Sequence, residues 1–73
     1  MAAATISDVI DYQLAGGGEV EVLWQQIPGR QPEVLLGTAQ NGDAVMVALS
    51  LAEAVKLATA LQHVVCEAAP MAV

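Results

Sequence analysis

The only histidine and the only cysteine of the chain lie three residues apart, at His63 and Cys66. On a helix this spacing places an imidazole and a thiol on neighbouring positions. A thiolate nucleophile also needs a third group that orients its base, and a zinc site needs four ligands, two of which a second chain would have to supply. We therefore expect neither catalysis nor a metal site here. His63 is predicted to face solvent, and Cys66 to act as a small hydrophobic side chain.

Carboxylates are the second group with chemical potential. Glu19 and Glu21 alternate along one predicted strand, with Glu33 opposite them across a hairpin. Calcium requires six or more oxygen ligands from a compact loop, and no such loop is present. We expect these side chains to be solvated charges that discourage edge-to-edge aggregation of strands.

Two loops complete the set of candidates. The glycines at 16–18 lack the G-x-x-x-x-G-K-[ST] frame of a phosphate-binding loop and precede a strand, so they indicate a flexible turn. Arg30, in the segment IPGRQP, is the only bidentate donor of the chain. It is expected to be solvated, or to contact a carboxylate on a protein partner. We predict no cofactor, and a protein that is not an enzyme.

Size and composition limit how such a chain is stabilised. Its 73 residues lie near the lower limit for an independent hydrophobic core, and its single cysteine excludes an internal disulfide. Small chains without disulfides or metals are commonly stabilised by oligomerisation. Because 56% of the residues are hydrophobic, we expect a single small domain that forms a homodimer.

Charge restricts the class of partner. The net charge is −6, from eight acidic residues against Arg30 and Lys56, which disfavours nucleic acid and anionic membrane surfaces. The N-terminal segment has no basic stretch typical of a signal peptide, and no run approaches the length of about 18 apolar residues needed to span a membrane. A lone thiol suits a reducing compartment, so we expect a cytoplasmic protein. In composition the chain is similar to the small acidic accessory and inhibitor proteins that phages and mobile elements often encode.

The element predicted most clearly is a C-terminal helix over residues 51–68. Ser50 and Glu53 form the S-x-x-E pattern of a capping box. At 100° per residue the segment gathers hydrophobic side chains on one side: Ala54, Val55, Leu57, Ala58, Leu61, Val64 and Val65. Residues 69–73 are expected to form a flexible tail.

Strands are predicted over residues 19–27, 33–40 and 43–49. Asn41-Gly42 suits a two-residue hairpin turn, which would pair Thr38 with Val45, Leu36 with Val47, and Val34 with Leu49. The segment 6–14 fits a fourth strand, or a short helix capped by Ser7. The resulting fold class is α+β: an antiparallel meander of three or four strands with one C-terminal helix packed on one face.

The meander sorts hydrophobic residues onto two faces, and the helix covers only one. The face expected to receive the helix holds Ile10, Tyr12, Leu14, Leu23, Val34, Leu36, Val45, Val47 and Leu49. The other face is expected to hold Val20, Val22, Trp24, Leu35, Gly37, Ala39, Met46 and Ala48. An uncovered apolar face of this kind usually marks an interaction site, unless residues 1–14 form a helix that covers Trp24.

The sequence thus predicts a non-catalytic protein-interaction module, a regulator or inhibitor with an acidic rim around an apolar sheet face. The residues expected to bind the partner are Trp24, Val20, Val22, Leu35, Met46, Glu19, Glu21 and Arg30. The alternative is a structural or accessory subunit of a larger protein complex.

Overall fold

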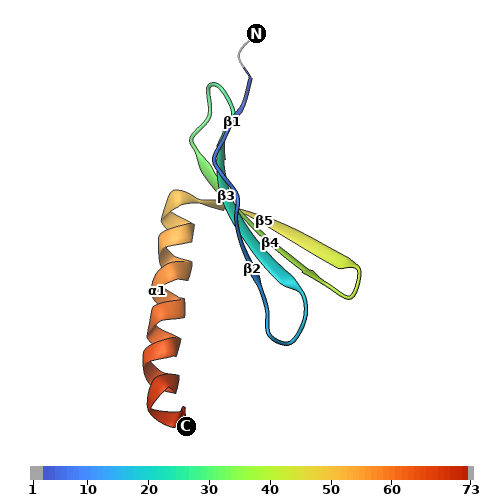
Figure 1. Cartoon of the computed structure of the whole chain (residues 1–73). Helices are drawn as coiled ribbons and strands as arrows, with labels where there is room; N and C mark the ends of the chain where they lie inside the picture. Colours follow the sequence, from blue (N-terminus) through green and yellow to red (C-terminus); the bar gives the residue numbers. More distant parts are fainter. Residues whose placement is uncertain (1–2, 73) are drawn as a thin grey trace.

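A computed structural model describes residues 3–72 as an antiparallel sheet of five strands followed by one long helix (Figure 1). This architecture confirms the α+β fold class. The strands are β1 Thr5–Ile6, β2 Ile10–Gln13, β3 Glu19–Gln26, β4 Glu33–Gln40 and β5 Asp43–Ser50. The helix α1 spans Leu51–Ala68, and a short 3-10 turn, η1, spans Ala69–Met71 where a flexible tail was expected; residue 73 lies outside the described residues.

The first segment forms two short strands instead of one, which is why the sheet has five strands. β1 and β2 both pair antiparallel with β3, one after the other along the same edge. Between them, the Ser7 backbone N–H donates to the carbonyl oxygen of Trp24 at 2.9 Å, and the Trp24 N–H donates to Ser7 Oγ at 2.9 Å. Ser7 therefore links the two strands with its hydroxyl, and the alternative in which it caps a helix is wrong. The other alternative, a helix over residues 1–14 that covers Trp24, is also wrong, because residues 5–6 and 10–13 are strands. Residues 1–2 lie outside the described part of the chain.

The β4–β5 hairpin has the turn and the register that its sequence predicts. Asn41 and Gly42 have φ angles of 54° and 82°, as a type I′ turn requires. Thr38 pairs with Val45, Leu36 with Val47, and Val34 with Leu49. Two positive φ angles in succession suit asparagine and glycine, so the turn residues set this register.

The predicted faces of β3 are wrong. β3 pairs with β4 so that Val22 lies opposite Leu36 and Trp24 opposite Val34. Val20, Val22 and Trp24 therefore share a face with Val34 and Leu36, whereas Leu23 lies opposite Leu35 on the other face. A shift of one residue in a strand exchanges its two faces. The six-residue connection 27–32 between these strands has no two-residue turn to specify the register.

α1 follows β5 without a linker, because Ser50 is both the last strand residue and the N-cap. The Glu53 N–H donates to Ser50 Oγ at 3.1 Å, and the Ser50 N–H donates to Glu53 Oε1 at 2.8 Å. These two reciprocal bonds form the capping box expected from the sequence. The helix bounds also match the predicted range of 51–68.

The helix lies on the expected side of the sheet but does not pack closely against it. α1 and the β4–β5 hairpin diverge from their junction at Ser50 (Figure 1). Within residues 3–72, the backbone of α1 comes within 8 Å, between Cα atoms, of only β4 and β5 of the sheet, and none of its side chains is buried. The radius of gyration is 15.0 Å, against about 11 Å for a compact domain of this length. The helix therefore lies over the predicted face of the sheet, but it buries none of its side chains against that face.

Replacing Ser50 by Ala should lower the free energy of unfolding by about 1 kcal/mol, because the Glu53 N–H loses its hydroxyl acceptor. Chemical denaturation followed by far-UV circular dichroism measures the loss. Thr59→Ala, on the outer side of the same helix, is the matched control and should change stability by less than about 0.5 kcal/mol. Equal losses in the two variants would contradict the capping role.

The capping box also predicts a dependence of stability on pH. The Ser50 backbone N–H, then its hydroxyl, and last the charge of Lys56 hold the pKa of Glu53 below its ordinary value of 4.5. The unfolded chain then takes up a proton before the folded chain does as the pH falls, so this stabilisation is present above pH 4.5 and is lost below it. Glu53→Gln keeps the capping hydrogen bond and cannot titrate. We expect the wild type to melt higher than Glu53→Gln at pH 7 and this advantage to disappear towards about pH 3. A difference in melting temperature between the two proteins that stays constant with pH would contradict a lowered pKa of Glu53 in the folded chain.

Candidate functional site

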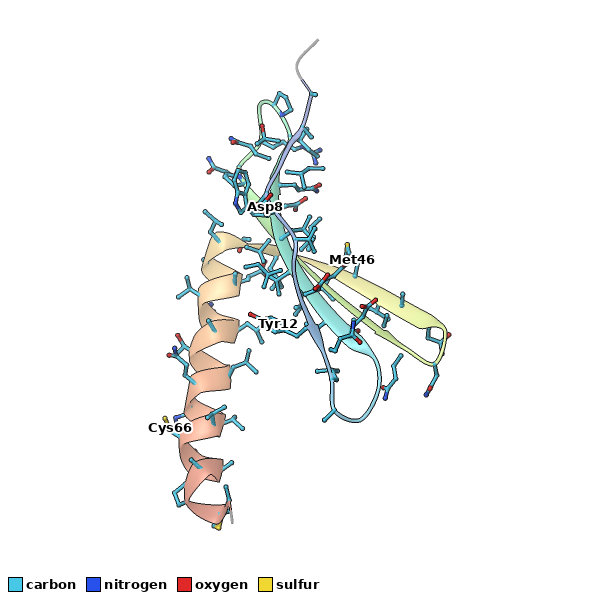
Figure 2. All side chains as sticks on the ribbon, viewed as in Figure 1. Asp8, Tyr12, Met46 and Cys66 are labelled. Carbon is cyan, nitrogen blue, oxygen red and sulfur yellow. The ribbon has the colours of Figure 1, made fainter. Side chains whose placement is uncertain are left out.

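The strand pairing defines two faces of the sheet with different chemistry. The helix-side face has polar residues at the strand ends, namely Thr5, Gln26, Gln40 and Asp43, and is otherwise hydrophobic except for Thr38. Its hydrophobic residues are Ile10, Tyr12, Val20, Val22, Trp24, Val34, Leu36, Val45, Val47 and Leu49. The open face, opposite the helix, combines carboxylates, amides and apolar residues: Asp11, Gln13, Glu19, Glu21, Leu23, Gln25, Glu33, Leu35, Gly37, Ala39, Ala44, Met46 and Ala48. Tyr12 projects from β2 towards the helix, whereas Met46 projects from β5 away from it (Figure 2).

The residues predicted to bind a partner do not form one surface. Trp24, Val20 and Val22 lie on the helix-side face, because β3 pairs one residue away from the expected register. Leu35, Met46, Glu19 and Glu21 remain together on the open face.

Arg30 belongs to neither face. It lies in the turn between β3 and β4, where its backbone N–H donates to the carbonyl oxygen of Ile27 at 3.0 Å. The predicted patch is therefore divided among three places.

The open face has a shallow hollow of about 150 Å³, whose lining includes Glu19, Glu21, Ala44 and Met46. Gly37 forms its floor and is the only buried residue among residues 3–72. A Cβ atom at this position would lie 3.0 Å from Glu21 Cγ and 3.1 Å from Met46 Cε. The hollow thus exists because residue 37 has no side chain.

Two carboxylates of the open face accept hydrogen bonds from neutral donors. Gln13 Nε2 donates to Glu19 Oε2 at 3.2 Å, and Gln25 Nε2 donates to Glu33 Oε1 at 2.8 Å. In the described part of the chain the only contact between a basic and an acidic side chain is on the helix, between His63 and Glu67. Since the side-chain amides carry no charge, the open face stays negatively charged and available to cations on another molecule.

A second depression, the helix–sheet cleft, lies where the helix and sheet diverge. It has a volume of about 280 Å³ and is lined by hydrophobic side chains only: Val22, Val34, Leu36 and Leu49 from the sheet, and Ala54, Leu57, Ala58 and Leu61 from the helix. Of the seven α1 residues that the hydrophobic pattern grouped on one side, Ala54, Leu57, Ala58 and Leu61 line the cleft, whereas Val55, Val64 and Val65 do not. The pattern gave no signal for the cleft, because periodicity does not specify how close two elements come.

Hydrophobic exposure is general in this chain. No hydrophobic side chain within residues 3–72 is buried, and Leu61, Val47 and Trp24 are 59%, 45% and 43% exposed. The accessible surface is 5927 Å², against about 4,200 Å² for a compact monomer of this mass. The excess, about 1,700 Å², is large for a chain of 73 residues.

His63 and Cys66 lie on the helix without forming a pair. His63 Nε2 contacts Glu67 Oε1 at 2.6 Å, one helical turn away, and both side chains are largely exposed. Cys66 is exposed and points away from the sheet (Figure 2). Among residues 3–72 no hydrogen bond joins Cys66 to another side chain, and no group of three or more His, Cys, Asp or Glu side chains converges as a metal site.

Comparison with protein families, with characterised sequences and with solved structures finds no match for this chain. Within the described residues, no helix has both the length and the apolar character that crossing a membrane requires.

The surroundings of Cys66 predict an ordinary thiol. Because no basic side chain is hydrogen-bonded to it, its rate of alkylation by iodoacetamide at pH 7 should lie within about threefold of that of a free cysteine peptide. Cys66→Ser should leave the melting temperature unchanged, since the side chain is exposed. Alkylation that is faster by orders of magnitude, with a dependence on His63, would indicate an activated nucleophile instead.

Proposed function

We propose that this chain is a non-catalytic protein-interaction module that acts as a regulator or inhibitor of a protein partner. The observation that carries the proposal is the absence of any buried hydrophobic side chain among residues 3–72. Apolar surface on this scale is usually covered by another protein in the assembled state. The chain is best understood as one component of an interface.

The open face is the surface proposed to meet the regulated partner. Leu35 and Met46 provide apolar contact beside the hollow above Gly37, and Glu19 and Glu21 provide negative charge around it. Glu33 adds a charge further along the same face. An apolar centre with a charged rim is the usual anatomy of a protein interface. The complementary partner has a basic surface with a protruding apolar side chain, and its association is accelerated by electrostatic attraction.

A structural or accessory subunit of a larger complex is the second candidate. It is favoured by the extent of exposed hydrophobic surface on the helix side, which suits a chain that is permanently covered. The two candidates differ in how the isolated chain behaves. A regulator is soluble and folded without its partner, whereas an accessory subunit aggregates unless it is expressed together with the complex.

The test uses a partner that has been captured with the wild-type chain, identified and purified, so that association is measured between two defined proteins. Glu19→Gln/Glu21→Gln removes two charges from the open face. The control Asp43→Asn/Glu67→Gln removes two charges elsewhere. We expect the open-face variant to lower the association rate constant by about tenfold at low salt, and the control to lower it by less than about twofold. Gly37→Ala should weaken binding further by filling the hollow.

Two results would count against this proposal. Equal losses in the two charge variants would show that only net charge matters and that the open face is not the binding surface. An isolated chain that aggregates at micromolar concentration, and is recovered only as part of a larger assembly, would favour the accessory-subunit candidate.

A further inference from the structure

The helix–sheet cleft is an unfilled hydrophobic space with two kinds of wall. Val22, Val34, Leu36 and Leu49 form its sheet wall, and the first half of α1 forms the other. Its volume of about 280 Å³ matches a few hydrophobic side chains and is too small for a whole helix or strand. A ridge, that is, a row of hydrophobic side chains on the surface of a helix or strand, fits this space and can insert between the two walls.

The chain itself carries such a ridge. The helix stripe, defined as Ala54, Leu57, Ala58, Leu61, Val64 and Val65, runs along α1 at the spacing of one helix face. The first four stripe residues, Ala54, Leu57, Ala58 and Leu61, line the cleft. Val64 and Val65 continue the stripe towards the C-terminus and are exposed. The small side chains of Ala54 and Ala58 leave room for a second helix to approach closely.

We propose that the helix–sheet cleft is filled by the helix stripe of a second copy of this chain, in a two-fold symmetric dimer. In each copy the stripe forms the helix wall of the cleft and continues beyond it at Val64 and Val65. In a two-fold arrangement the stripe of each copy enters the cleft of the other, so both are satisfied by the same contact. A different protein that filled the cleft with a ridge of its own would still leave Val64 and Val65 of the stripe exposed unless it offered a second apolar surface.

The amount of exposed surface fits this occupant. The excess of about 1,700 Å² per chain would give about 3,400 Å² buried between two copies. Obligate homodimers bury about 2,000–5,000 Å². Covering this surface would bring each chain close to the area of a compact protein of its mass.

Charge permits two acidic chains to meet on this side. The helix stripe and all the residues that line the cleft are uncharged. Of the charged helix residues, Lys56 and Glu67 lie on the other side of α1 at about 100° per residue. Glu53 lies at the border of the stripe, in the first turn, where its carboxylate accepts from the Ser50 N–H. Two copies, each with a net charge of −6, can therefore associate through this face without placing like charges opposite each other.

The first measurement is the mass of the wild-type chain by sedimentation equilibrium. We expect twice the 7.5 kDa of one chain at micromolar concentration. Leu61→Asp places a charge in the middle of the stripe and should raise the dissociation constant by about tenfold or more. Thr59→Asp introduces the same charge on the outer side of the helix and should leave the dimer intact. A wild-type mass of 7.5 kDa at high micromolar concentration would overturn the proposal.

Because Leu61→Asp could also unfold the chain, disulfide trapping provides a second measurement. In a Cys66→Ala background, single cysteines replace Ala58, Leu61 or Val65 on the stripe, or Lys56 or Thr59 on the outer side. Mild oxidation should link two copies through at least one stripe position, where the two helices face each other near the symmetry axis, and through neither outer position. Linkage at the outer positions only, or a dimer in which no stripe position links, would overturn the cleft assignment.

The dimer and the proposed partner are tested separately. Glu19→Gln/Glu21→Gln lies on the open face and should leave the dimer mass unchanged while it weakens partner binding. A dimer without any partner effect would contradict the proposed function alone, and a monomer that still binds through the open face would contradict the dimer alone.

Discussion

The direct junction between β5 and α1 is the constraint on which the rest of this structure depends. Ser50 ends the strand in an extended conformation and at the same time accepts the first capping hydrogen bond of the helix. With no linker between them, the helix leaves the sheet in a direction fixed by one residue. It therefore diverges from the strands, and its hydrophobic side faces theirs across a cleft that the chain itself does not close.

An open cleft has a clear energetic consequence. Ordering a chain of this length costs of the order of 100 kcal/mol in conformational entropy, and apolar burial must offset most of that cost. Here no described hydrophobic side chain is buried within one copy, and no disulfide is available because Cys66 is the only cysteine. The proposed two-fold dimer would supply the missing burial through the helix-side face.

The two proposals assign assembly to the helix-side face and recognition to the open face. The helix-side face is uncharged apart from the ends of its strands, which suits a close and permanent contact between identical chains. The open face carries Glu19 and Glu21 around a hollow formed by Gly37, and Glu33 further along the same face. Solvated carboxylates are unsuited to a dry core and suited to long-range attraction of a basic partner. A two-fold dimer would present two such open faces on its outer surfaces.

Local residue choices determined the elements of this protein, and the tertiary structure determined which surfaces they make. Asn41-Gly42 determined the β4–β5 turn because few residue pairs adopt two positive φ angles, and Ser50 with Glu53 determined where α1 begins. Both signals act over four residues or fewer, so they can be read from sequence. The face on which Trp24 lies was predicted wrongly, because the connection 27–32 leaves the β3–β4 register to be set by pairing along the whole strand. The cleft, too, was not predictable, since hydrophobic periodicity shows which side of a helix faces the sheet and not the distance between them. That distance is decided by the exit angle at Ser50, which is a property of the folded chain.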